Sequence, residues 1–448
     1  FWLDRGGDAP TSKALWIPTL WIMINFSRPL SVWLGMAPAK VDPSIYLEGS
    51  PVDRAGYLIL LIAGLIVLFI RSGQAGAKLR RNGAVLAYFS YAALSALWSD
   101  YPFVTFKHWT KGIGDVAMVL IVVTELHPEA AIKWLLSRSG FIFMPLSLLY
   151  SKYYPDLGRF LSPGWVSEYA GVTQNKNELG QICLIFGLGA LWCFLSIWEH
   201  RERPDRRRRL TAYGGYLTVI IWLFVMANSM TSLCCVVLAA VVMIWASRRS
   251  VWTSGSIHVA AGAAIGVAAL ALFGDPQMVT MVGRNATLTG RTDIWHWVLT
   301  LVRNPLLGTG YESFFMGPRL KAFWHLDNDA FASLQEAHNG YLEVYLNLGW
   351  VGVAIFASLI VTGYRRVIAA FRANPRFGRL TLAWFIAAII YGFTEAGYRM
   401  QTPIWIIFLL AIMAAPETEE LPPNEPADED LAWTDATQPA ANLAWSGR

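Results

Sequence analysis

The stretch EAHNGYLEVYLNLGWVG, residues 336–352, joins a polar segment directly to a long apolar run. The apolar run continues to about residue 363, and some 20 apolar residues are enough to cross a bilayer as a helix. His338 and Asn339 therefore stand at the entrance of a predicted transmembrane helix. This arrangement indicates a membrane protein whose chemistry lies at the membrane surface.

The composition extends this interpretation to the whole chain. The 448 residues are 55% hydrophobic and only 15% charged, whereas about a quarter of the residues in a soluble domain are charged. The mean hydropathy is +0.41. We predict an all-α fold, a polytopic membrane helical bundle, because a helix satisfies its own backbone hydrogen bonds in lipid. A set of soluble domains is excluded.

Apolar runs predict about twelve transmembrane helices, with boundaries good to ~2–4 residues. The predicted spans are residues 14–36, 57–71, 83–98, 112–126, 130–150, 178–198, 211–228, 229–247, 257–274, 341–363, 380–395 and 402–415. Residues 1–13 are polar and lack the pattern of a cleavable signal peptide, so we expect none there.

Basic residues in the connecting loops orient these helices, because loops rich in Arg and Lys remain in the cytoplasm. Four connections are basic: the loops at 71–81, 199–209 and 364–379, and the connection after the eighth span, with Arg248 and Arg249. All four fall on one side if the spans alternate. We therefore expect both termini in the cytoplasm. The large loop at about 275–340, before the tenth span, then lies on the opposite side of the membrane.

Composition also divides the chain into two parts. Residues 1–415 form the predicted membrane domain, and residues 416–448 are acidic and rich in Pro and Ala, as in PETEELPPNEPADED. Such a segment cannot bury enough apolar surface to fold, so we predict a disordered acidic cytoplasmic tail. The four cysteines lie in apolar runs and are expected to pack as small hydrophobic residues.

Polar clusters gather at the predicted outer ends of the helices. Lys111 and Asp115 lie one helical turn apart, which is typical of a local ion pair, but charges near a span can also face a polar cavity. In QNKNELG, residues 174–180, capping is expected to account for Asn177 and Glu178. Capping leaves the neighbouring Lys176 unexplained, because the helix dipole disfavours a cation there.

Three further clusters have both a structural and a functional interpretation. Turn chemistry alone can explain NSMTS, residues 228–232. Glu395 and Arg399 share the last outer hairpin and could form a local salt bridge of little energetic value. A lone histidine at a helix end, such as His338, is more often an interfacial residue than a catalyst. Its position among several outer polar clusters favours the functional interpretation.

The stretch VGRNATLTGRTDIW of the large outer loop, residues 282–295, carries two arginines, Arg284 and Arg291. They could contact phospholipid headgroups, or they could recognise a diphosphate, because the guanidinium fork binds phosphate oxygens bidentately and keeps its charge. The segment 292–303 has an apolar face with tryptophans and predicts an interfacial helix. NPLLGTGYESF, residues 304–314, then predicts a sharp turn at Pro305 and the following glycines.

Taken together, these stretches resemble the bacterial O-antigen ligase and polymerase superfamily, which includes O-antigen ligases, Wzy-type polymerases and exopolysaccharide polymerases. The matching features are LWSDYP at 97–102, Arg159 with QNKNELG, NSMTS, TGRTDIW followed by NPLLGTGYESF, and AHNGYLEVYLNLG. The resemblance extends from about Trp98 to Pro403. The order of these motifs, with a long outer loop before the tenth span, is more specific than any one of them.

The resemblance implies a metal-independent glycosyltransferase of the C type without a cofactor. Such an enzyme lies in the bacterial inner membrane, and it moves a glycan from an undecaprenyl diphosphate carrier to an acceptor at the periplasmic face. The large loop at about 275–340 would then face the periplasm. Arginines of the outer loops engage the diphosphate, and a histidine entering a span assists the acceptor hydroxyl, which points to Arg159, Arg291 and His338 as catalytic residues. The expected substrate-binding residues are Arg284, Lys176, Asn175, Asn177, Asn339, Glu395 and Lys111. For Asn339, a helix cap is the alternative interpretation.

General chemistry supports this mechanism. Departure of a diphosphate builds negative charge, which fixed arginines stabilise preferentially in the transition state. A sugar hydroxyl needs a base, and an exposed histidine with a pKa near 6.5 can serve. Direct attack would invert the anomeric centre.

The form of two motifs, with Lys176 in one and AHNGYL in the other, favours a polysaccharide polymerase. The alternative in the same family is a ligase that attaches O-antigen to lipid A core. A secondary transporter or flippase is the alternative of another class, but it should place polar residues at mid-bilayer on broken helices.

The expected partners follow from this assignment. They are the lipid-linked donor, a glycan acceptor that is a lipid-linked chain or lipid A core, and membrane lipid. A chain-length regulator is a further candidate, and no nucleic acid is expected.

Overall fold

The structure is a computed structural model, and it describes residues 10–36, 50–162, 166–202, 204–248, 255–273, 291–324 and 335–414. The chain divides into two units, residues 1–415 and 416–448. The predicted tail and Arg284 lie outside the described residues, and so do parts of the large loop.

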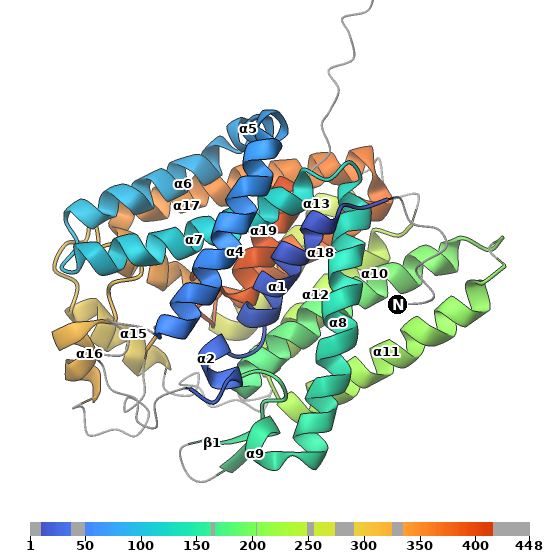
Figure 1. Ribbon diagram of the computed structural model, residues 1–448, viewed down its shortest axis with the longest axis horizontal. Coiled ribbons are helices and arrows are strands. Elements are labelled where there is room, and N and C mark those ends of the chain that lie inside the picture. The colour runs from blue at the N-terminus through green and yellow to red at the C-terminus, as the bar shows by residue number, and fades with distance from the viewer. Residues whose placement is uncertain are drawn as a thin grey trace, which may run out of the picture. The chain divides into compact units, whose positions relative to one another are not determined.

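The described part of the first unit is almost entirely helical, as predicted (Figure 1). The helices are α1 (Trp16–Asn25), α2 (Leu30–Trp33), α4 (Pro51–Ile70), α5 (Ser72–Arg81), α6 (Gly83–Leu94), α7 (Pro102–Val123), α8 (Pro128–Tyr153), α9 (Pro155–Gly158), α10 (Lys176–Glu199), α11 (Arg206–Ala227), α12 (Met230–Trp245), α13 (Ser256–Phe273), α15 (Arg291–Thr300), α16 (Gly317–Trp324), α17 (Gly340–Ala373), α18 (Pro375–Tyr391) and α19 (Pro403–Met413). Short 3-10 turns occupy Lys13–Leu15 and Ser95–Leu97.

Every predicted span overlaps at least one helix. Five described helices, α4, α8, α10, α11 and α17, are by length and composition able to cross a membrane, and four shorter apolar segments accompany them. The chain is therefore an all-α polytopic membrane protein.

Two segments differ from the prediction. The basic loop at 71–81 is largely the helix α5, and its basic residues Lys78, Arg80 and Arg81 lie in the last turn, where the helix dipole favours cations. The first span is broken between α1 and α2, at Phe26–Pro29. Proline removes a backbone donor and disfavours helical geometry in the residue before it.

A small β-hairpin in the segment 151–177 was not predicted. Strand β1 (Arg159–Ser162) pairs antiparallel with β2 (Val166–Tyr169), and Arg159 lies opposite Tyr169. A two-stranded ribbon leaves backbone groups unpaired, which water can satisfy and lipid cannot. The hairpin therefore fits a segment outside the bilayer.

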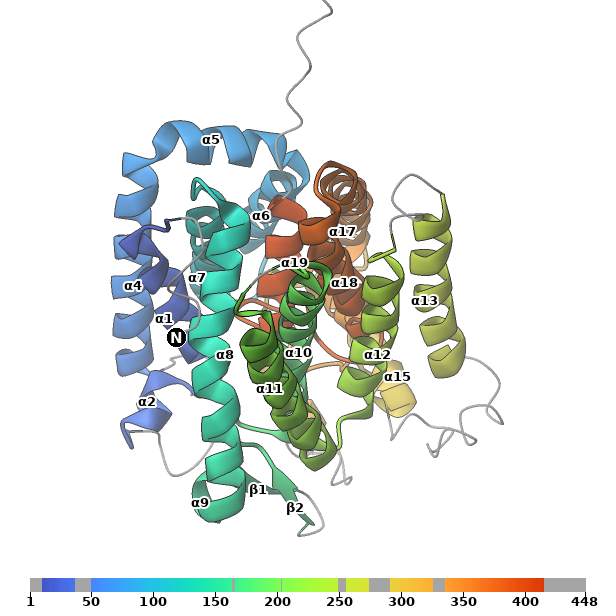
Figure 2. The ribbon, with the colours of Figure 1, turned by 90° about the vertical axis from the view of Figure 1, so that its right-hand side faces the viewer.

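The centre of the bundle consists of the most apolar helices. Every residue of α19 is buried. Of the segment of α10 that is long and apolar enough to span the membrane, 78% is buried, whereas only 11% of the corresponding segment of α4 is buried. A helix that is apolar on all sides is typical of a bundle interior. In Figure 2, α18 and α19 lie inside, with α4 and α13 on opposite flanks. Three cysteines pack as expected, whereas Cys234 is exposed.

The two ends of the bundle carry different elements. Figures 1 and 2 place the basic helix α5 at one end, and α9, β1 and α15 at the other. This separation agrees with the predicted opposite sides of the loops at 71–81 and 275–340.

Helix α17 is broken at Gly349, whose φ of 64° and ψ of −167° are not helical. The loop 304–316 fills this break. The N–H of Gly310 donates to the carbonyl of Asn347 at 2.8 Å, and the N–H of Trp350 donates to the carbonyl of Pro305 at 3.0 Å. Backbone groups that the break leaves without helical partners are thus satisfied by the loop, which is held against the start of α17.

Candidate functional site

The turn before α17 fixes His338. Asn339 caps the helix, and its Oδ1 accepts hydrogen bonds from the N–H groups of Tyr341 and Leu342 at 3.1 and 3.0 Å. One turn later, the carboxylate of Glu343 accepts the N–H of Ala337 at 2.5 Å. His338 itself adopts a φ of 49°, which is uncommon for a residue other than glycine and is often found at functional sites. Asn339 is therefore a helix cap.

Two carboxylates flank the His338 imidazole. Its Nδ1 lies 2.9 Å from Glu336 Oε1 and 3.3 Å from Glu395 Oε2. Glu395 is buried, and its Oε1 lies 2.6 Å from Arg291 Nη2. The Nδ2 of Asn177 reaches the same oxygen at 3.4 Å. The structure thus brings together four residues predicted for the site from four separate segments.

Arg399 extends this cluster on the other side. Its Nε lies 3.0 Å from Glu312 Oε2, and its Nη1 lies 3.4 Å from Glu336 Oε2. The result is a continuous series of contacts, Glu312–Arg399–Glu336–His338–Glu395–Arg291, which we call the ion-pair chain. The expected salt bridge between Glu395 and Arg399 is wrong, because each of the two finds an opposite charge from another segment.

Electrostatics set the protonation of His338. Burial alone would lower the pKa of His338, but Glu336 foremost, and then Glu395, stabilise the imidazolium and raise the pKa to about 10. Burial would likewise raise the pKa of Glu336, but His338 and Arg399 hold it at about 2. The expected exposed histidine with an ordinary pKa is therefore wrong. At neutral pH, His338 is a partly buried cation.

The same residues could in principle hold a metal. Glu336, His338 and Glu395 offer ligand atoms within 4.8 Å of one another. However, Arg291 and Arg399 already bind the two carboxylates, and Nδ1 of the imidazolium carries a proton. A cation would have to displace both guanidinium groups, so the arrangement favours the ion-pair chain over a metal centre.

Arg291 is positioned by the helix that it begins. The segment predicted as an interfacial helix is helical as α15, and its buried face packs on protein. Trp295 donates its indole N–H to the carbonyl of Ala337 at 2.8 Å. Ile294 and Val298 are buried in a small core with Phe314, Ala337 and Leu346. The large loop therefore carries Arg291 directly beside the turn that holds His338.

The start of α10 contributes Asn177. The capping expected of Asn177 is instead provided by Asn175, whose Oδ1 accepts the N–H of Glu178 at 3.0 Å. This leaves Asn177 free to face Glu395. Lys176 forms an ion pair with Glu168 of β2 at 2.6 Å, which explains a cation at this helix start.

The NSMTS hairpin supports the same region. Ser229 Oγ lies 3.4 Å from Asn177 Oδ1, and the hydroxyls of Thr231 and Thr394 lie 3.2 Å apart. Turn chemistry explains Asn228, which ends α11 in a left-handed conformation. Ser229 and Thr231, which follow it, contact Asn177 and Thr394 and thereby hold Asn177 and the segment before Glu395 in place.

Asp115 organises the last outer hairpin. Its carboxylate accepts the Trp21 indole N–H at 2.9 Å and the Gln401 N–H at 2.7 Å. The expected pair with Lys111 is not formed, since both oxygens of Asp115 face other donors. Lys111 Nζ lies 6.0 Å from the centre of the Tyr57 ring. Asp115 therefore supports the hairpin that carries Glu395 and Arg399.

Arg159 is held within the β-hairpin. Its guanidinium stacks over the Tyr169 ring at 4.7 Å, and its Nε donates to the carbonyl of Ser151 at 3.0 Å. These contacts do not bring it to His338. Sequence reasoning also missed Glu336 and Glu312. Glu336 could have been found from the sequence, because it stands two residues before His338. Glu312 could not, because its role depends on Arg399 from a distant segment.

The chain is similar to two groups of known proteins. A family model described as O-antigen ligase matches residues 215–357, which include Arg291 and His338. The exopolysaccharide production protein ExoQ of Rhizobium meliloti (strain 1021) is 21% identical over 371 residues, covering 80% of this chain and 81% of ExoQ. Both matches support the resemblance to the O-antigen ligase and polymerase superfamily. Glu395 lies outside the segment that matches the family model.

Proposed function

We propose that this protein is a periplasm-facing glycosyltransferase that moves a glycan from undecaprenyl diphosphate to a sugar hydroxyl. The observation that carries the proposal is His338 held between Glu336 and Glu395, with Arg291 bound to Glu395, at the entrance of a membrane helix. A base and a phosphate-binding cation are the two groups that this reaction needs. Polymerisation of a surface polysaccharide is the reaction that we favour.

Arg291 is the proposed partner of the leaving diphosphate. Negative charge grows on that group as the bond to the anomeric carbon breaks, and a fixed guanidinium stabilises the transition state more than the ground state. Glu395 orients Arg291 through the contact at 2.6 Å. Arg159, Arg284 and Lys176 are proposed to bind the donor farther out. The capping residues Asn175 and Asn339 act on structure instead.

His338 is the proposed base, acting through Nε2. Its Nδ1 faces the two carboxylates, as in other carboxylate–histidine pairs, so Nε2 is the nitrogen that can meet an acceptor hydroxyl. Because the pKa of His338 is raised to about 10, only a small fraction is neutral at pH 7. The rate should therefore rise with pH until His338 is neutral.

A ligase is the second candidate. It is favoured by the description of the matched family as O-antigen ligase, whereas the ExoQ likeness covers far more of the chain. Both reactions use the same donor chemistry and the same base. They differ in the acceptor, which is a lipid-linked glycan in one and lipid A core in the other.

The test is glycan transfer by the purified protein in lipid nanodiscs, supplied with an undecaprenyl diphosphate oligosaccharide. His338→Ala should lower kcat by about 10²- to 10⁴-fold, the range for loss of a general base. Arg291→Lys should lower it less than Arg291→Ala but not restore it, because Lys lacks the planar fork. His127→Ala, at the exposed start of α8, is the control.

Wild-type turnover in His338→Ala would show that the base is assigned wrongly. Activity should also survive EDTA. Loss on chelation that Mg²⁺ restores would contradict a metal-independent reaction and point back to Glu336, His338 and Glu395.

A further inference from the structure

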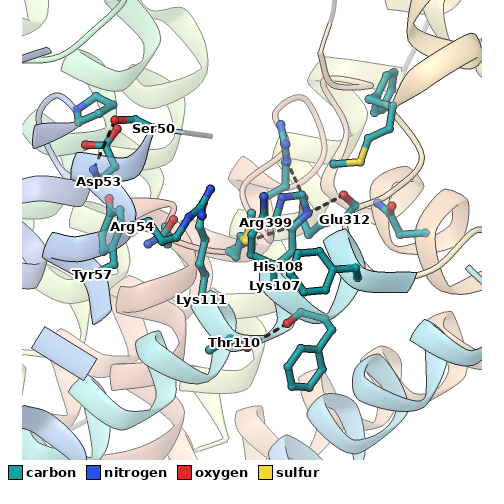
Figure 3. Close-up of a pocket in the computed structure, with 18 of the residues that line it drawn as sticks. Ser50, Asp53, Arg54, Tyr57, Lys107, His108, Thr110, Lys111, Glu312 and Arg399 are labelled. Atoms are coloured by element: carbon teal, nitrogen blue, oxygen red, sulfur yellow. Dashed lines mark hydrogen bonds and ion pairs between the residues drawn. The ribbon is translucent and has the colours of Figure 1, made fainter. Parts of the chain in front are cut away.

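A cavity adjoins the ion-pair chain. It measures about 620 Å³ and lies between α4, α7 and the loop that carries Glu312 (Figure 3). Sites for small ligands usually measure about 300–1,000 Å³. Glu312 and Arg399 line the cavity, so it meets the ion-pair chain at the end opposite Arg291. Two contacts, Arg399–Glu336 and Glu336–His338, separate it from the His338 imidazole.

Two carboxylates that line the cavity are engaged by neighbouring parts of the protein. Asp53 accepts hydrogen bonds from the N–H and the hydroxyl of Ser31 at 2.8 and 2.6 Å. Glu343, which is 3% exposed, accepts the N–H of Ala337 at 2.5 Å and the side-chain amide of Asn347 at 3.4 Å. Both carboxylates therefore have hydrogen-bond donors from the protein itself.

The other charges of the wall are engaged as well. Glu312 pairs with Arg399 at 3.0 Å, and Lys111 Nζ lies 6.0 Å from the centre of a tyrosine ring of α4. Arg54 and Lys107 interact with other groups of the protein. Residues of both signs thus share the wall, and their charges are largely met by the protein. The cavity suits a neutral, polar ligand better than an ion.

His108 offers such a ligand a hydrogen-bond acceptor. It lies on α7, is 7% exposed and lines the cavity (Figure 3). Its Nδ1 lies 3.0 Å from the backbone carbonyl oxygen of Glu312, which can only accept, so Nδ1 carries a hydrogen. Within the described part of the chain, no group forms a hydrogen bond with Nε2. Nε2 is therefore the ring nitrogen available to a ligand.

The surroundings of His108 keep it neutral. The residue precedes the predicted span at 112–126. Burial foremost, and then Lys111, lower the pKa of His108 to about 3, and the bond to the Glu312 carbonyl offsets only part of this effect. Arg399 and Lys107 act in the same direction as Lys111. At neutral pH, Nε2 thus keeps its lone pair and can accept a hydrogen bond.

Aromatic rings also line the cavity. They come from Tyr57 on α4, Phe106 on α7 and Phe315 in the loop 304–316. The face of an aromatic ring carries partial negative charge, so it packs well against C–H groups. A sugar ring is neutral, carries hydroxyls at its edge and presents C–H groups on its face. It therefore complements both His108 and the aromatic rings.

We propose that this cavity binds a sugar unit of the glycan acceptor and that Nε2 of His108 accepts a hydrogen bond from one of its hydroxyls. The inference rests on the proposed function. His108 thereby selects the acceptor sugar, because a site that hydrogen-bonds a hydroxyl discriminates strongly against an analogue that lacks it. The nucleophilic hydroxyl is a different one, and its proton moves to His338.

The location of the cavity favours the acceptor over the donor. In a direct displacement, the attacking hydroxyl and the leaving diphosphate lie on opposite sides of the anomeric carbon. Arg291, the proposed partner of the diphosphate, and the cavity lie at opposite ends of the ion-pair chain, with His338 between them. The reacting sugar of the donor is bonded directly to its diphosphate and is therefore expected near Arg291.

The binding test is isothermal titration calorimetry of the protein in nanodiscs with the repeat-unit oligosaccharide of the native polysaccharide, freed from its carrier by mild acid. H108N keeps an N–H group for the Glu312 carbonyl but lacks Nε2, so it should weaken binding about tenfold. H108Q can accept through its Oε1 and should bind more tightly than H108N. H127N, at the exposed start of α8, is the control and should bind like the wild type.

A second pair of variants fills the cavity without changing His108. Leu58 on α4 lines the cavity and is 52% exposed, whereas Leu65 on the same helix is 48% exposed and lies outside the lining. L58W should weaken binding, and L65W should not. Wild-type affinity in H108N, or displacement of the oligosaccharide by inorganic diphosphate, would overturn the proposal. If H108N does not fold, wild-type affinity in L58W would overturn it instead.

A further arm uses the core oligosaccharide freed from lipid A. Binding of either oligosaccharide that depends on His108 supports the acceptor site and names its source, and binding of neither would overturn it. In the transfer assay, H108N should raise the KM for the free oligosaccharide about tenfold and leave the KM for the lipid-linked donor unchanged.

The two measurements separate the site from the reaction. Binding that depends on His108 without any transfer would refute the proposed reaction and keep the sugar site. Transfer with an unchanged acceptor KM in H108N would refute the sugar site alone.

Discussion

His338 shows how neighbouring charges change the chemistry of one residue. The histidine was predicted from its place before an apolar run, but its protonation depends on Glu336 and Glu395. These carboxylates make it a cation at neutral pH. It can therefore act as a base only when the pH rises or when a neighbouring negative charge is lost. The pH dependence of transfer therefore reports on the geometry of the site.

Replacement of Glu336 by Gln tests this coupling. Glu336 is the largest cause that raises the pKa of His338, so its removal should lower that pKa toward the ordinary value near 6.5. Because the neutral form is the base, the rising limb of the kcat/KM profile should move to lower pH by at least about one unit, equivalent to ~1.4 kcal/mol.

The matched control for this profile is Glu202→Gln, in the exposed connection between α10 and α11. It should leave the limb in place. A limb that stays in place in Glu336→Gln, or moves to higher pH, would contradict the role of His338 as base.

Among the elements, α17 and the loop 304–316 act as one unit. The turn predicted around Gly308 and Gly310 is present, and it bonds to the break in α17. Gly349 is required at the break for two reasons. Its φ and ψ fall in a region almost restricted to glycine, and an added Cβ would lie 2.2 Å from the carbonyl oxygen of Leu306.

Gly349→Ala should therefore destabilise the protein by ~1–3 kcal/mol and loosen the loop that carries Glu312. Thermal unfolding in detergent, followed by intrinsic fluorescence, measures the effect. Gly266→Ala is the control, because it lies in α13 with open space around it and alanine favours a helix. Equal melting temperatures for both variants would show that the break does not need glycine.

For the whole molecule, the decisive property is the side on which each end of the bundle lies. Reporter fusions test the proposed orientation. Alkaline phosphatase, which is active outside the cytoplasm, should be active when inserted at 325–334 and inactive at 201–205. Green fluorescent protein should show the reverse pattern. A cytoplasmic result for 325–334 would remove both the periplasmic site and the proposed donor.

Much of the site was predictable as a set of residues but not as a set of contacts. His338, Arg291, Asn177 and Glu395 were predicted, and they meet. Asn175 and Asn339 both cap helices. Capping was an alternative interpretation of the sequence for Asn339 but not for Asn175. Arg399 was assigned the wrong partner, because proximity in sequence suggested Glu395 while the fold supplied Glu312 and Glu336.

The sequence by itself determined the membrane class and the approximate position of the helices. Both depend on local quantities, since the bilayer thickness sets a length and apolar runs of that length are visible in the chain. Only the tertiary structure decided the contacts of the site. Arg291 and Asn177 reach Glu395 across 104 and 218 residues of sequence. Charge pairing is decided by distance in space, and no local pattern states which of several outer carboxylates a given arginine will meet.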